Sequence, residues 1–236
     1  MTTDSRPPAR LVGLLPSALL DAWAVVMPTD CSGCGAADRA LCGPCRAALT
    51  PNPVATTRED LSIWSALEYG GVTSRVLGAF KDGGRTDAAG PLAAALRAAI
   101  GAALIDRPEA RPGSVVLATV PSSRLAWRLR GFHPVDLLVR RAGFTPTRLL
   151  AARRTAADQV GLGRQARIDN RRDSLRATRP LDGWSILLVD DIVTTGSTLL
   201  EARRAIQAAG GQVAGLATVA HTPRHHPDSS RSRQTA

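Results

Sequence analysis

The chain has 236 residues, of which 44% are apolar and 21% charged, which fits a soluble globular protein with one ordinary domain and a small appendage. The net charge of +10 comes from 29 arginines and a single lysine, Lys81. This excess favours anionic partners such as phosphorylated small molecules or nucleic acid, unless it is only a solvated basic surface. Aromatic residues make up 3%, which argues against a surface that stacks many bases.

The N-terminal quarter differs in composition from the rest. Residues 1–10 are polar and contain prolines, which predicts disorder. Residues 11–58 are expected to hold a short amphipathic helix (Ser17–Val26), a cysteine cluster and a linker at 50–58. Pro16 and Asp21 interrupt the first apolar run, so we expect neither a signal peptide nor a membrane span, and a cytoplasmic location.

The main domain is expected over residues 59–222, followed by a disordered polar tail at 223–236. Its apolar periodicity alternates between strands and helices, which predicts an α/β fold with a parallel sheet covered by helices on both faces. The predicted strands are 61–69, 114–120, 185–189 and 212–220, and the predicted helices are 72–80, 88–105, 134–142, 166–176 and 197–209.

Four cysteines lie close together as two CxxC pairs, seven residues apart: Cys31, Cys34, Cys42 and Cys45. Each pair suits a tight turn that aims two thiolates at one metal, and four thiolates suit a closed tetrahedral Zn²⁺ site. The stretch has nothing else to form a core, so the metal would supply its folding energy. An iron–sulfur cluster, two disulfides and a redox dithiol pair are the alternatives.

The segment SILLVDDIVTTGSTLLEARRAI carries the clearest functional signal. A buried strand delivers Asp190 and Asp191 at its carboxyl end, where open α/β sheets bind their ligands. The following turn opens a helix, so its amides and hydroxyls can hold a phosphate: Thr194, Thr195, Gly196, Ser197 and Thr198. Two carboxylates can accept hydrogen bonds from a vicinal diol and hold Mg²⁺ through water, so the segment fits ribose 5-phosphate.

Simpler interpretations of this segment compete. The acidic pair could be an isolated Mg²⁺ site, the hydroxyl residues could be helix caps, and the glycine could belong to an ordinary loop between strand and helix. The complete string is more specific than any of these features taken alone.

A second polar region follows the strand at 114–120. The turn at 119–123 can present amides to a diphosphate, and Arg128 and Arg130 can supply positive charge. Residues 153–170 are long, polar and contain two glycines, as in a loop that closes over a site, although an ordinary basic surface loop would look similar.

VDDIVTTGSTL resembles the loop of type I phosphoribosyltransferases that binds 5-phosphoribosyl-1-diphosphate (PRPP). Over residues 20–222 the chain also resembles the competence protein F (ComF) family. The matching residues outside that loop are Lys81, Val120, Pro121, Arg130, Gly131, Phe132, Arg154, Thr155, Gln159, Leu162, Arg167 and Asn170.

The resemblance implies roles for these positions. Asp190 and Asp191 would contact the ribose, residues 194–198 the 5-phosphate, and Pro121 with Ser122 the diphosphate side. Asp190, Asp191, Arg128, Arg130 and Lys81 would carry catalysis, with Mg²⁺ as cofactor, and the cysteines would bind structural zinc. His133 and Pro134 stand where the family usually has Asn-Gln, and Ser122 and Ser123 where a proline often recurs.

Two functions from different classes follow. The first is transfer of a phosphoribosyl group from PRPP to a base, an amine or ammonia. The second, implied by the resemblance to the ComF family, is a non-catalytic PRPP sensor that binds single-stranded DNA during uptake in natural transformation, together with DNA-uptake or helicase proteins. The charge of +10, the expected basic helix that ends at Arg176 and the expected zinc finger fit the second function.

Overall fold

The computed structural model describes residues 29–37, 39–106, 115–122, 124–153 and 173–223. The helix expected at Ser17–Val26, most of the 153–170 loop and the tail beyond residue 223 lie outside them. The helices and strands are α2 (Gly43–Ala47), β1 (Val54–Arg58), β2 (Leu61–Glu68), α3 (Gly71–Lys81), η1 (Thr86–Ala88), α4 (Ala89–Ile105), β3 (Val115–Thr119), α5 (Arg124–Arg130), α6 (Pro134–Arg141), β4 (Leu150–Ala152), β5 (Leu175–Ala177), β6 (Ser185–Val193), α8 (Ser197–Gln207) and β7 (Gln212–His221).

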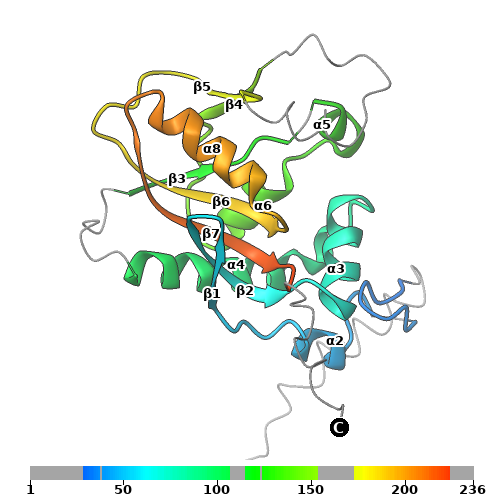
Figure 1. Cartoon of the computed structure of the whole chain (residues 1–236). Coiled ribbons are helices and arrows are strands. Elements are labelled where there is room, and N and C mark those ends of the chain that lie inside the picture. The colour runs from blue at the N-terminus through cyan, green and yellow to red at the C-terminus, as the bar shows by residue number, and fades with distance from the viewer. Residues whose placement is uncertain (1–28, 38, 107–114, 123, 154–172, 224–236) are drawn as a thin grey trace, which may run out of the picture.

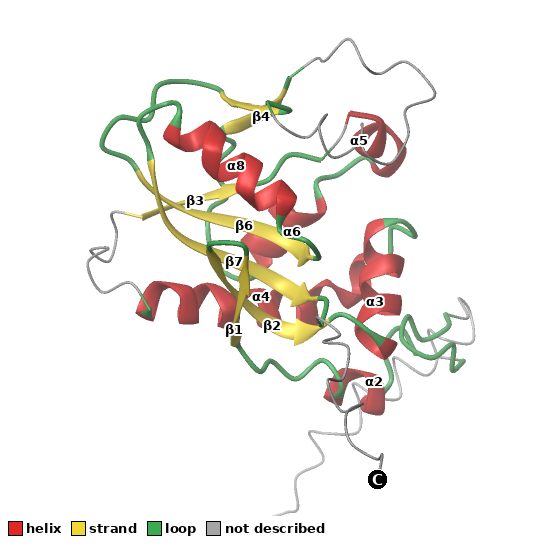
Figure 2. Ribbon diagram, viewed as in Figure 1, coloured by secondary structure: helices red, strands yellow, loops and turns green. Residues whose placement is uncertain are grey.

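A five-stranded sheet in the order β1-β2-β7-β6-β3 forms the centre of the fold (Figure 1). Strands β2, β7, β6 and β3 pair in parallel, which confirms the predicted α/β architecture. Helices α3, α4 and α6 cover one face of the sheet and α8 covers the other (Figure 2). A two-stranded sheet of β4 and β5 lies beside α8.

The side chains of the central strand β6 alternate between the two faces of the sheet, which explains why helices pack on both faces. Side chains of β6 point in turn to opposite faces: Leu187 and Val189 pack with α3, α4 and α6, whereas Ile186 and Leu188 pack with α8 and β5. All four are fully buried. A strand apolar on both faces belongs in the middle of a covered parallel sheet, where β6 lies.

The structure corrects two predicted elements and extends a third. Residues 54–58, expected as part of a linker, form the edge strand β1, which pairs antiparallel with β2. The helix expected at 166–176 does not extend to its predicted end, because Leu175–Ala177 forms strand β5 and pairs with β4. Strand β6 continues to Val193, beyond the predicted end at Val189.

Helix α4, taken together with η1, is long and apolar enough to cross a membrane by length and composition alone, although the sequence analysis expected no such segment. Half of its most apolar stretch is buried, and α4 packs on β2 and β7. A buried core helix passes the same test, so α4 is a weak sign of a membrane span.

Candidate functional site

The acidic pair lies at the carboxyl end of β6, inside an open bowl of about 380 Å³. Asp190 is partly buried and Asp191 is 9% exposed. The bowl is lined by Tyr69, Lys81, Val120, Pro121, Ser122, Ala126, Arg130, Val135, Asp190, Asp191, Ile192, Thr194 and Thr198. Strand ends, α3 and α5 therefore converge on the two carboxylates.

Lys81 reaches the acidic pair from the last turn of α3. Its Nζ lies 2.8 Å from Oδ2 of Asp191. Burial, and then the charge of Asp191, raises the pKa of Asp190 to about 8. At neutral pH the Asp190 carboxyl therefore keeps its proton, while Lys81 balances the charge of Asp191.

The turn after β6 has the composition and position of an anion cradle. Gly196 adopts φ of 87° and stands at the N-cap of α8, a helix of 11 residues, and the amides of the first turn of a helix have no partner within the helix. The Ser197 amide donates to Thr195 Oγ1 at 3.4 Å, and the Thr195 hydroxyl lies 3.1 Å from that of Ser197. Thr194 and Thr198 line the bowl, and Thr195, Gly196 and Ser197 line a hollow that adjoins it.

The structure brings together most of the predicted site residues. Pro121 and Ser122 face the acidic pair across the bowl, and Arg130 lines it from α5. Arg128 is exposed and does not line the bowl. His133 lies in a smaller adjoining cavity with Pro121, Ser122 and Asp136.

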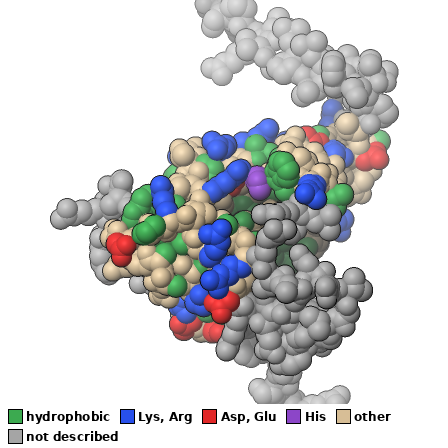
Figure 3. Space-filling model, turned by 90° about the horizontal axis from the view of Figure 1, so that it is seen from above, with side chains coloured by type: hydrophobic (Ala, Val, Ile, Leu, Met, Phe, Trp, Pro, Cys, Tyr) green, Lys and Arg blue, Asp and Glu red, His purple; other side chains and the backbone are tan. Residues whose placement is uncertain are grey.

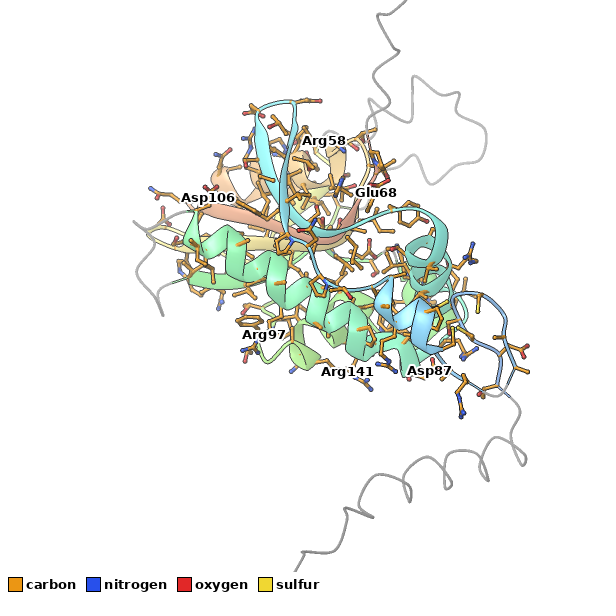
Figure 4. The ribbon with its side chains drawn as sticks, turned by 90° about the horizontal axis from the view of Figure 1, so that it is seen from below. Arg58, Glu68, Asp87, Arg97, Asp106 and Arg141 are labelled. Atoms are coloured by element: carbon orange, nitrogen blue, oxygen red, sulfur yellow. The ribbon has the colours of Figure 1, made fainter. Side chains whose placement is uncertain are left out.

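Arg58 supports the cradle and was missed by the sequence analysis. It belongs to β1, is 4% exposed, and donates from Nε to the Thr194 carbonyl at 2.9 Å and from Nη2 to the Thr222 carbonyl at 2.5 Å. Figure 4 labels it on the hairpin strand beside β2. A Cβ atom added to Gly196 would lie 2.8 Å from Cβ of Arg58, so the strand and the turn are in direct contact.

Asp136 is a second missed residue, at the start of α6. The residue is 7% exposed, and its carboxylate accepts hydrogen bonds from Thr119 Oγ1 at 2.7 Å and from Arg148 Nε and Nη2 at 2.9 and 2.7 Å. These contacts tie α6 to the end of β3, just before Pro121. Neither Arg58 nor Asp136 belongs to a motif, so the sequence carried no local signal for them.

The four cysteines form a compact cluster beside α3. Their Sγ atoms all lie within 4.8 Å of one another, and Sγ of Cys34 and Cys42 are 3.7 Å apart. Four sulfurs at about 2.3 Å from a tetrahedral Zn²⁺ stand about 3.8 Å apart, so the spacing fits zinc. The amides of Gly33 and Cys42 donate to Sγ of Cys31 at 3.4 and 3.3 Å.

The thiol chemistry also fits a metal ligand set. Burial opposes ionisation of Cys31, but amides of Cys42, Gly33 and Cys34 outweigh it and lower the pKa of this thiol to about 6. Burial, and then hydrogen bonds to the neighbouring thiols, raises the pKa of Cys45 to about 12. A cation is therefore needed before all four sulfurs become thiolates.

Comparison with known families identifies the main domain. The profile of the phosphoribosyl transferase domain matches residues 111–233, more than half of the 236 residues. The chain belongs to this family. The matched segment includes β3, the Pro121–Ser122 turn, β6 and the 194–198 turn, so the acidic pair and the cradle are parts of a phosphoribosyltransferase domain.

Solved structures with similarity include the allosteric regulatory enzyme of purine biosynthesis, at 19% identity and TM-score 0.29, covering 53% of this chain and 25% of that one. They also include adenine phosphoribosyltransferase from Leishmania tarentolae, at 13% identity and TM-score 0.26, covering 53% of this chain and 57% of that one. Adenine phosphoribosyltransferase from Leishmania donovani is similar at 11% identity and TM-score 0.26, and the match covers 58% of this chain and 71% of that one. This chain therefore covers about a quarter of the length of the purine-biosynthesis enzyme and 57% of the length of the Leishmania tarentolae enzyme.

Proposed function

We propose that this phosphoribosyltransferase-domain protein binds PRPP and transfers its phosphoribosyl group to a nitrogen nucleophile. The observation that carries the proposal is the bowl at the end of β6, where the acidic pair stands between the 194–198 cradle and the Pro121–Ser122 turn. In this assignment the cradle holds the 5-phosphate, Asp190 and Asp191 hold the ribose hydroxyls, and the turn faces the diphosphate.

The reaction would be a displacement at C1 of the ribose. The bond from C1 to the diphosphate oxygen breaks, diphosphate leaves with the bonding electrons, and the lone pair of the acceptor nitrogen forms the new bond. The nitrogen then loses one proton to solvent or to the departing diphosphate. Positioning and charge stabilisation of the leaving group account for catalysis. In this assignment Arg130 and Lys81, which both line the bowl, supply positive charge, and Arg128 on α5 is a further candidate that lies outside the bowl lining.

Magnesium is proposed as the partner of PRPP. Carboxylates are oxygen ligands that Mg²⁺ accepts, and Asp190 and Asp191 are the residues that would hold it, through water. When bound, the ion would neutralise charge on the diphosphate.

The most direct functional test is diphosphate release from PRPP in the presence of candidate acceptors: nucleobases, small amines and ammonia. We expect release with one acceptor class, and a loss of about a hundredfold or more in Arg130→Met if the guanidinium stabilises the leaving group. Arg140→Met, an exposed arginine on α6 outside the bowl, is the matched control. If no acceptor supports release while PRPP still binds, the transferase role fails and a sensor role remains.

We also propose that the chain is a ComF-type protein acting in the cytoplasm. The four-cysteine cluster, the Arg-Gly-Phe segment and the PRPP-binding string follow one another along the chain, and this combination is the one that resembles the ComF family. The alternative role, binding of single-stranded DNA during uptake, is supported by one surface feature.

That feature is a groove of about 600 Å³ between β5 and the C-terminal end of α8, which shares no lining residue with the bowl. Its lining includes Arg153, Arg176, Arg179 and Arg204 together with Asp182. Basic side chains gather on the side of the molecule that is seen from above (Figure 3). Arg204 is bound to Glu201 and Asp173, whereas Arg179 lies over the ring of Trp184 at 4.5 Å.

Fluorescence anisotropy with a labelled single-stranded oligonucleotide tests this second role. Binding at ~50 mM salt that falls steeply as salt rises would support phosphate contacts. Arg176→Met/Arg179→Met should weaken the binding. The control, Arg140→Met/Arg141→Met, removes the same amount of charge from α6 and should leave the binding unchanged. Arg141 is visible in the view from below (Figure 4). Undetectable binding at low salt contradicts the role.

A further inference from the structure

Three consecutive residues at the end of helix α3 and its C-cap contact the bowl or the segment beside it. Phe80 packs edge-on against Phe132, with ring centroids 5.7 Å apart. Lys81 pairs with Asp191 at 2.8 Å, and Asp82, the C-cap residue, accepts from Nη2 of Arg130 at 2.7 Å. The end of α3 therefore contacts both the segment that follows β3 and the acidic pair at the carboxyl end of β6.

The other end of the same helix contacts the cysteine cluster. Arg75 Nε donates to the carbonyl of Gly33. Gly33 itself is packed between the cluster and α3: an added Cβ would lie 2.6 Å from Sγ of Cys45 and 3.0 Å from Cγ1 of Val72. Past the helix end, Arg85 Nη2 donates to the Asp30 carbonyl at 3.0 Å.

The cluster and the helix also share one apolar core. Cys31, Leu41, Cys45 and Leu49 belong to the same buried group as three residues of α3, and Val76, Leu77 and Phe80 are fully buried there. Residues 31–45 are too few to form a core of their own, so without metal this side of α3 loses an ordered neighbour.

We propose that the four-cysteine metal site is a positioning element for the PRPP bowl: with metal bound, it holds α3 so that Lys81 meets Asp191 and Asp82 meets Arg130. That the ligand of the bowl is PRPP rests on the proposed function. The coupling between the metal site and the Lys81–Asp191 pair does not depend on it. The cluster acts on the bowl through α3, a rigid helix of 11 residues packed at both ends, rather than by contact with substrate.

The sequence offers an unusually clean probe, because Lys81 is the only lysine in the chain. Reductive methylation with isotope-labelled formaldehyde labels Lys81 and the terminal amine alone, and methylation keeps the positive charge. Lys81→Arg identifies which NMR signal belongs to Lys81. Asp191→Asn gives the signal position of a Lys81 that has lost its ion pair.

The experiment compares the Lys81 signal of the full chain, without PRPP, in the zinc-loaded and chelator-treated states. We expect the zinc-loaded signal to differ from that of Asp191→Asn, and zinc removal to move it toward the Asp191→Asn position. Arg75→Met cuts the link to Gly33 while leaving all four cysteines, and should move the signal in the same direction. Arg46→Met, an exposed change on α2, should leave it in place.

Far-UV circular dichroism shows whether zinc removal unfolds the domain. If it does, the Arg75→Met variant, which keeps all four cysteines, tests the proposal instead. A Lys81 signal that stays unchanged in both the zinc-free protein and Arg75→Met overturns the proposal. PRPP titration of the same samples separates the two ideas. A shifted Lys81 signal without PRPP binding in any sample would retain the coupling and reject the proposed function.

Discussion

At the residue scale, the charge of the site is set by three groups. Asp190 carries a pKa of about 8 because it is buried beside Asp191, whose own charge is balanced by Lys81. A carboxyl with a raised pKa holds its proton at neutral pH and loses it only as pH rises through the folded-state value. Ribose hydroxyls and a cation both favour the ionised form, so ligand binding and deprotonation of Asp190 are coupled.

This coupling predicts proton release. At neutral pH, Mg²⁺-PRPP binding should release up to one proton per site, and the affinity should rise with pH until the pH exceeds about 8. Calorimetry in buffers of different ionisation enthalpy measures the release. Asp191→Asn removes the neighbouring charge and should reduce it. Binding that releases no proton, with an affinity independent of pH, would show that Asp190 is already ionised or is not involved.

Gly196 gives a second prediction at this scale. With φ of 87° and Arg58 2.8 Å from an added Cβ, Gly196→Ala strains the turn and displaces Arg58. We expect a stability loss of about 1–2 kcal/mol and a fall in PRPP affinity of about tenfold or more, equivalent to about 1.4 kcal/mol. Gly210→Ala, which has the same φ at the far end of α8, should lower stability without changing affinity. If both variants lose the same amount of PRPP affinity, the loss in Gly196→Ala follows from lower stability, and a specific role of the turn in binding is contradicted.

At the element scale, α6 and β1 position the two loops of the bowl. Asp136 links α6 to the end of β3, and Arg58 links β1 to the cradle. Asp136→Asn weakens charged hydrogen bonds in a buried setting, and should cost about 2 kcal/mol, measured by urea unfolding. Asp60→Asn breaks an exposed pair with Arg203 and should change nothing measurable. Equal midpoints for wild type and Asp136→Asn would contradict the structural role.

Elements with a strong local pattern were predictable, and those stabilised by distant partners were not. The strands at 61–69 and 185–189 and the helices at 72–80 and 88–105 carry apolar periodicity, and all are confirmed. Strand β1 was missed because its turn, Glu59-Asp60, lacks the usual hairpin residues, although Glu59 adopts φ of 53°. Its one buried charge, Arg58, is satisfied by carbonyls 136 and 164 residues away in sequence.

The same distinction applies to the site. The acidic pair, the cradle and the cysteine cluster are contiguous strings, so their chemistry could be inferred from spacing. The partners of Lys81 and Arg130 could not, because Asp191 and Asp82 meet them only after α3 packs on the sheet. Strand β5 replaced the end of a predicted helix because its ladder with β4 is a tertiary contact that overrides helical periodicity.

At the scale of the whole molecule, the cysteine cluster and the phosphoribosyltransferase domain share a core through α3. We expect one zinc ion per chain by atomic emission spectrometry, lost in Cys34→Ser/Cys42→Ser, with lower thermal stability in the variant. Iron in place of zinc, or a metal-free protein with unchanged stability, would reject a structural zinc site.

The central claim is that the bowl at the end of β6 holds PRPP, and calorimetric titration of PRPP into the zinc-loaded protein tests it most directly. The titration is run with and without Mg²⁺, on wild type and on Asp190→Asn/Asp191→Asn. We predict magnesium-dependent binding that the double variant loses while keeping its fold. Failure of the wild-type protein to bind PRPP, or equal binding by the double variant, would contradict the claim.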